Sequence, residues 1–158
     1  MKAATVSELK KELNTRSEKE LIELVLRLSK FKKENKELLT YLLYEVADET
    51  SFIKSIKMEI DELFEDINTS RTFYAKKTIR KILRNIKKYC RYSKKKPTEV
   101  ELLMYFCVKM KTLPAYLKRV TVIQNIYDRQ VVLINKRIAT LHEDLQYDYR
   151  LEMEELGI

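Results

Sequence analysis

The chain has 158 residues, of which 45% are hydrophobic and 35% are charged, and its formal net charge is +8. This length predicts a single domain, residues 1–158, with a continuous core, and the apolar content argues against an intrinsically disordered chain. One glycine and two prolines are too few for a protein rich in tight hairpins, so an all-α fold is expected.

The N-terminal third shows the signals of two helices. Ser7 is suited to cap a short helix that has apolar residues on one side. Ser17 and Glu20 form a capping box, which marks the beginning of a second helix. Apolar residues then recur with a period of about 3.5 as far as Val46, which predicts one continuous helix over this stretch.

The middle of the chain predicts an antiparallel pair of helices. Turn and cap residues at 48–51 separate the second helix from a third, whose apolar residues follow helical spacing over 52–67. The connection at 68–70 is so short that it favours antiparallel neighbours. In the fourth helix, roughly 71–92, the apolar residues form a stripe around Ile79, and the basic residues occupy an arc from about 60° to 200° away from it.

The predicted centre of the fold comes next. Residues 93–97 form the clearest loop of the chain. Thr98 and Glu101 then form a second capping box, which marks the beginning of a fifth helix. The stretch 102–108 is apolar on all sides, so this helix should lie in the middle of the bundle.

The last helix is predicted to be very long. Pro114 suits its first turn, and no break residue follows as far as Leu156. A continuous helix of about 40 residues measures roughly 60 Å, which exceeds the width of a compact domain of this size. Either the helix kinks without a proline, or its end projects and packs on a second copy. We favour projection and a homodimer through the C-terminal helix. The expected architecture is an all-α antiparallel bundle of about six helices with a long C-terminal helix.

One segment carries the whole surplus of positive charge. Twelve basic residues and no acidic residue lie between Ile67 and Thr98, whereas the 66 residues before this segment sum to −3 and the 60 after it to −1. Such a concentrated positive segment is typical of a surface that meets a polyanion or another acidic partner. The candidate binding residues are Lys77, Arg80, Lys81, Arg84, Lys87, Lys88, Arg91, Lys94, Lys95 and Lys96.

Three interpretations of this basic segment are open. In the first, it binds nucleic acid mainly through the phosphates, and Tyr74 and Tyr92 flank it for stacking on single-stranded bases. In the second, acidic residues at 59–66 and in the tail at 152–155 neutralise the bases within the chain. In the third, the segment meets a protein partner or an acidic lipid surface.

The residues offer little for catalysis. Gly157, the single glycine, excludes phosphate-cradling loops, dinucleotide fingerprints and nucleophile elbows. His142, the single histidine, excludes multi-histidine metal sites within one chain and is expected to be a solvated side chain. Carboxylates at Asp61, Glu62 and Glu65 leave a helix-borne metal site as a minor alternative. We therefore expect a protein that is not an enzyme and holds no cofactor.

No targeting or membrane segment is evident. The N-terminal residues lack the apolar stretch of a secretory signal, and the longest uncharged apolar runs have seven residues where a membrane span needs about 20. Cys90 and Cys107 lie in apolar helical stretches and do not suggest a disulfide framework. These features predict a cytoplasmic protein with reduced thiols.

The N-terminal residues carry a family resemblance. The opening combines residues 6–13 with the run Ser17-x-Lys19-Glu20-Leu21-Ile22-Glu23-Leu24. It resembles the start of uncharacterised bacterial all-helical proteins of unknown function. It is also similar to the SAP module, a small helical DNA-binding unit, although the glycine-containing link of that module is absent here. Neither resemblance implies an enzymatic activity. The whole pattern favours a non-catalytic interaction or scaffold module, with nucleic-acid binding through residues 71–96 as the alternative.

Overall fold

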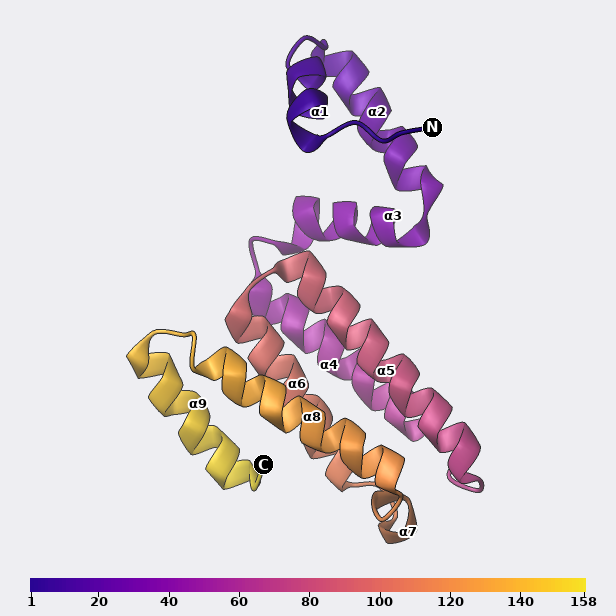
Figure 1. Cartoon of the computed structure of the whole chain (residues 1–158), viewed down its shortest axis with the longest axis vertical. Coiled ribbons are helices and arrows are strands. Elements are labelled where there is room, and N and C mark those ends of the chain that lie inside the picture. The colour runs from indigo at the N-terminus through magenta and orange to yellow at the C-terminus, as the bar shows by residue number, and fades with distance from the viewer. The chain divides into compact units, whose positions relative to one another are not determined.

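The computed structural model describes all 158 residues and confirms the all-α fold. The chain forms two compact units, residues 1–44 and 45–158, where a single domain was expected (Figure 1). The helices are α1 (Val6–Leu13), α2 (Glu18–Phe31), α3 (Lys33–Thr40), α4 (Glu49–Glu65), α5 (Thr72–Ser93), α6 (Lys96–Lys111), α7 (Ala115–Lys118), α8 (Thr121–Ile138) and α9 (Glu143–Leu156), and a π-helical turn, Tyr41–Glu45, follows α3.

Capping boxes begin the first two helices. The predicted box at Ser17 and Glu20 is confirmed, with the Ser17 amide donating to a Glu20 carboxylate oxygen at 2.8 Å. At α1 the cap lies two residues earlier than predicted. Thr5, not Ser7, occupies the cap position, because its hydroxyl accepts from the Glu8 amide at 3.3 Å while its own amide donates to the Glu8 carboxylate.

The single helix predicted as far as Val46 is divided at Lys32. This residue is extended, with φ −143° and ψ 147°, so α2 ends before it and α3 begins after it. The Asn35 side chain donates to the Leu28 carbonyl at 2.9 Å. In a continuous helix the Lys32 amide would be the donor to that carbonyl. The Asn35 side chain therefore supplies the hydrogen bond that the Leu28 carbonyl would otherwise lack, at a break that no proline or glycine marks.

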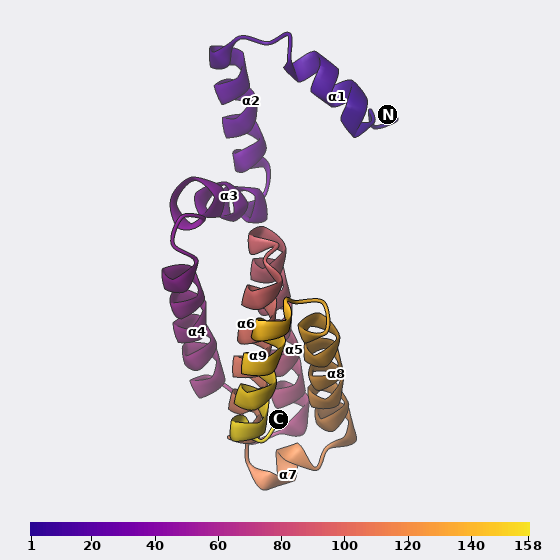
Figure 2. The same cartoon turned by 90° about the vertical axis from the view of Figure 1, so that its left-hand side faces the viewer.

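The second unit is a bundle centred on α6, as predicted. Helices α4, α5 and α8 all contact α6, and α9 packs on α8 (Figure 1). Helix α7 joins α6 to α8 at one end of the unit (Figure 2). The buried residues of α6 surround its axis, and they are Thr98, Val100, Leu102, Leu103, Met104, Phe106, Cys107 and Met110. Phe106 also makes an edge contact with Phe64 of α4, with ring centroids 5.8 Å apart.

The beginning of α6 differs from the predicted capping box at Thr98. The helix begins at Lys96, with Pro97 in its first turn. The Thr98 side chain is buried, and its hydroxyl donates to the Glu49 carboxylate of α4 at 2.6 Å. A tertiary hydrogen bond thus takes the place of the predicted local cap.

The predicted long C-terminal helix is three helices. The breaks fall at residues 119–120 and 139–142, without glycine or proline in either. At the second break the Gln146 side chain donates to the Leu141 carbonyl at 2.9 Å, and His142 takes the cap position of α9. Because α8, the longest of the three with 18 residues, measures only about 27 Å, the length argument for a projecting, dimerising helix end no longer applies.

A polar contact connects α4 to α6. The Asp61 carboxylate accepts hydrogen bonds from the Tyr105 hydroxyl at 2.7 and 2.8 Å and pairs with Lys109 at 2.8 Å. Partial burial alone would raise the pKa of Asp61. The hydrogen bonds from Lys109 and Tyr105, with the Lys109 charge, outweigh burial and hold that pKa below its usual value.

We expect Asp61→Asn to lower the free energy of unfolding at pH 7 by about 1 kcal/mol, because the ion pair is partly exposed. A carboxyl group with a lowered folded pKa stabilises the fold above its unfolded pKa, and that contribution disappears as the pH falls through the folded value. As the pH decreases below about 4, the unfolding free energy of the variant should therefore fall less than that of wild type. Urea denaturation across this range measures both effects. The control is Asp66→Asn, which changes an exposed acid without an ion pair. Equal stability of Asp61→Asn and wild type at pH 7 would contradict the prediction.

Candidate functional site

The exposed cations of α5 form a continuous surface, which we call the basic face. It consists of Lys77, Arg80, Lys81, Arg84, Lys87 and Arg91. All six side chains are exposed, and none forms an ion pair or a side-chain hydrogen bond within the chain. Helix α5 contains no acidic residue at all. The face extends for about 21 Å along the helix at 1.5 Å per residue.

The packing of α5 turns this face away from the body of the unit. Of the predicted apolar stripe, Ala75, Ile79, Ile82 and Ile86 are buried, whereas Leu83 and Cys90 are partly exposed. One flank of the stripe meets α4, where Asn85 and Tyr89 donate to the Glu59 carboxylate at 3.5 and 2.7 Å. On the helical wheel these two residues lie at about 240° and 280° from Ile79, whereas the basic face lies between about 80° and 200°. The cations therefore point away from the acidic helix.

Intrachain neutralisation does not reach the basic face, although Lys95 of the same segment pairs with Glu49 of α4 at 2.9 Å. The short 66–71 connection does place α4 beside α5, as predicted. Two other α4 acids bond to groups outside the basic face: Glu59 bonds to Asn85 and Tyr89, and Asp61 bonds to α6. The acidic residues of the C-terminal tail, at 152–155, form no ion pair with the basic segment either.

Three of the four remaining candidate residues make contacts within the chain. The Lys88 ammonium lies over the Tyr89 ring, 4.5 Å from its centroid. In the turn after α5, Lys94 is exposed and has a left-handed backbone with φ 57°. Lys95 pairs with Glu49 at 2.9 Å, and Lys96 donates to the Thr140 carbonyl at 3.5 Å. The structure thus brings six of the ten predicted residues together on one free face and engages three others with the chain itself.

The aromatic residues near this face also differ from the prediction. Tyr92 is only 7% exposed, so it is not available for stacking, whereas Tyr74 is 46% exposed. The adjacent Phe73 was missed, and it is 66% exposed. The two rings lie edge to face with centroids 5.6 Å apart. The helical wheel could have identified Phe73, because it falls at about 120° from Ile79, within the arc of the basic face.

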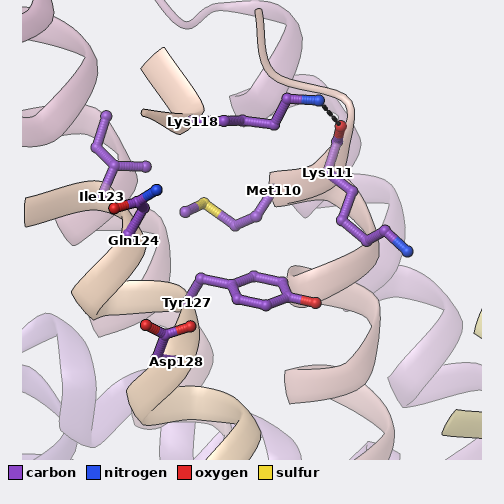
Figure 3. Close-up of a pocket in the computed structure, with 7 residues that line it drawn as sticks. All are labelled: Met110, Lys111, Lys118, Ile123, Gln124, Tyr127 and Asp128. Atoms are coloured by element: carbon purple, nitrogen blue, oxygen red, sulfur yellow. Dashed lines mark hydrogen bonds between the residues drawn. The ribbon is translucent and has the colours of Figure 1, made fainter. Parts of the chain in front are cut away.

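A pocket of about 560 Å³ lies where α6, α7 and α8 meet (Figure 3). Its lining residues are Met110, Lys111, Lys118, Ile123, Gln124, Tyr127 and Asp128. Both lysines are engaged with helix ends. Lys118 donates to the Lys111 carbonyl at 3.1 Å, and Lys111 extends away from the pocket and donates to the Leu156 carbonyl at 2.7 Å. Burial, with smaller effects from nearby charges, raises the pKa of the Tyr127 hydroxyl, which therefore stays protonated near pH 7.

The other candidate chemical groups are dispersed. Burial raises the pKa of each free thiol, Cys90 and Cys107, to about 12, so neither is a thiolate near neutral pH. His142 is solvated, as expected, and its Nδ1 accepts from the Asp144 amide at 3.5 Å as the cap of α9. No group of three or more histidine, cysteine or acidic side chains is arranged to hold a metal ion, and Asp61 bonds instead to α6.

None of the helices combines the length and the apolar character that a membrane-spanning segment needs. No family model, no curated protein and no solved structure matches this chain. The resemblances of the N-terminal segment therefore stay predictions, and the functional argument depends on the chain's own residues.

A buried carboxylate holds the turn at the end of α5. Glu49 is largely buried, with its side chain 17% exposed, and it accepts hydrogen bonds from the hydroxyls of Ser93 and Thr98 and from the Lys95 ammonium.

The variant Glu49→Ala would leave these buried hydroxyls without an acceptor, which costs about 1–3 kcal/mol for each such group. We expect the variant to lose about 2 kcal/mol of unfolding free energy in chemical denaturation. Glu65→Ala, at an exposed position of the same helix, should change it by less than about 0.5 kcal/mol. Equal losses in the two variants would contradict a specific role for Glu49.

Proposed function

We propose that this chain is a non-catalytic nucleic-acid-binding module that contacts the phosphate backbone through the basic face of α5. One observation carries the proposal: six exposed cations lie along one helix with no acidic side chain of the chain paired to any of them. The alternative of internal neutralisation required such pairs. A polyanion is the ligand class whose charge complements this surface.

The spacing of the cations supports an extended anionic ligand. Lys77, Arg80, Lys81, Arg84, Lys87 and Arg91 follow one another at intervals of one to four residues. Like charges three and four residues apart on a helix repel each other, and a bound row of phosphates relieves that repulsion. Phosphate contacts carry little sequence information, and no base-reading motif accompanies the face, so binding should depend weakly on sequence.

A charge-reversal triple variant tests the proposal. Lys77→Glu, Arg84→Glu and Arg91→Glu together should weaken binding to RNA or DNA by at least about tenfold and leave the melting temperature nearly unchanged, since all three side chains are exposed and unpaired. Wild-type affinity should fall with salt with a log–log slope of about −4 to −5 for six neutralised phosphates. Fluorescence anisotropy at several salt concentrations measures both quantities.

The matched control reverses three exposed bases elsewhere in the second unit: Lys54→Glu, Arg129→Glu and Lys136→Glu. It changes the net charge equally but leaves the basic face intact, so it should retain most of the wild-type affinity. Two outcomes would reject the proposal. One is wild-type protein that shows no salt-sensitive retention on nucleic acid or heparin, and the other is an equal loss in both triple variants.

A second candidate function, self-association, is favoured by the apolar surface of α2. Leu24, Leu28 and Phe31 are all exposed although they follow the three–four spacing of a coiled-coil seam that begins at Leu21. A seam of this kind pairs with a second copy, and it supports a scaffold role independent of the basic face. It differs from the expected dimer through the C-terminal helix.

Sedimentation over a range of protein concentrations tests this second candidate. Wild type should form a dimer, and Leu24→Glu with Leu28→Glu should be monomeric because two charges would enter the apolar seam. Lys19→Glu with Lys30→Glu, at exposed polar positions of the same helix, should leave the dimer intact. A monomeric wild type at all concentrations would exclude self-association.

A further inference from the structure

The exposed aromatic pair at the beginning of α5 specifies the kind of nucleic acid. We infer that the ligand is single-stranded, and that Phe73 and Tyr74 stack on its unpaired bases at the N-terminal end of the basic face. This inference rests on the nucleic-acid binding proposed above and adds a specificity that the cations alone do not supply.

The position of Phe73 is the first argument. It lies one helical turn before Lys77, within the same arc as Arg80, Arg84 and Arg91. Its side chain is 66% exposed, so it takes no part in the core beneath the helix. A ligand that crosses this surface therefore meets an apolar ring and a row of cations in sequence along one line.

The second argument concerns which class of polyanion has groups that bind both the cations and the aromatic rings. Base faces in a duplex are covered by their neighbours, whereas the bases of a single strand can turn out and stack on aromatic side chains. Phosphates of the same strand then reach the cations that follow along the helix. Heparin and acidic protein surfaces offer negative charge without nucleobases, so they would use the cations and not the ring pair.

The third argument places the stacking platform at one end. The aromatic residues at the other end of α5 are already engaged, because Lys88 lies 4.5 Å from the Tyr89 ring centroid and 6.0 Å from that of Tyr92. Tyr89 also donates to the Glu59 carboxylate at 2.7 Å, and Tyr92 is only 7% exposed. Phe73 and Tyr74 touch each other and project from the first turn of the helix. A bound strand would thus have a defined end at the ring pair.

The test compares four probes in fluorescence anisotropy or competition. They are oligo(U) and oligo(dT) of about 15 nucleotides, a DNA duplex of the same length, and heparin. Phe73→Ala with Tyr74→Ala should weaken binding of the two single strands by about 5- to 150-fold, the range expected for losing one stacked base. Affinity for the duplex and for heparin should change less than about twofold, because the phosphate contacts remain.

Two further variants serve as controls. Phe73→Trp should restore single-strand affinity in the Tyr74→Ala background, since a larger ring also stacks. Tyr147→Ala removes an exposed ring from α9, 70% exposed, and should leave every affinity unchanged.

Four outcomes distinguish this inference from the nucleic-acid binding on which it rests. Equal single-strand affinity in wild type and the double alanine variant, or equal losses on the single strands, the duplex and heparin, would overturn the inference alone. Wild type that binds none of the four probes would overturn both. Loss of binding in the charge-reversal variant, together with selective loss of single-strand affinity in the aromatic variant, supports both.

Discussion

The burial of one face of α5 against α4 and α6 is the contact on which the other features depend. Ala75, Ile79, Ile82 and Ile86 are almost completely buried, and each isoleucine contributes about 1.5–3 kcal/mol through removal of its side chain from water. Repulsion between neighbouring cations on a helix amounts to only about 0.2–0.5 kcal/mol for each pair. Hydrophobic packing therefore exceeds the repulsion, and it can hold a row of cations in solvent without any acidic partner.

Periodicity predicted the parts of the fold that burial determines. The central place of α6 followed from its apolar circumference, and the buried stripe of α5 followed from its spacing. The breaks in the longer helical patterns were not predictable in this way. The breaks at Lys32 and at 139–142 coincide with hydrogen bonds from the side chains of Asn35 and Gln146 to nearby carbonyls. Neither residue is a usual helix breaker, so pattern and propensity alone favoured continuous helices.

The sequence predicted the charge of the candidate site but not which of its cations pair with groups of the same chain. The composition showed a concentrated positive segment, and the structure adds which cations stay unpaired. That distinction depends on the rotation of α5 about its axis, which directs Asn85 and Tyr89 toward Glu59 of α4. The aromatic residues show the same limit. Tyr92 was chosen by residue type and is buried, while Phe73, defined by its angle on the helix, is exposed.

The turn after α5 opposes backbone stability to surface charge at one residue. Lys94 adopts a left-handed backbone, with φ 57°, which glycine tolerates without strain and other L-residues disfavour by roughly 1–2 kcal/mol. A glycine at this position would relax the chain reversal but remove a positive charge from the end of the helix. Replacement of Lys94 by glycine would therefore exchange a gain in backbone stability for a loss of positive charge.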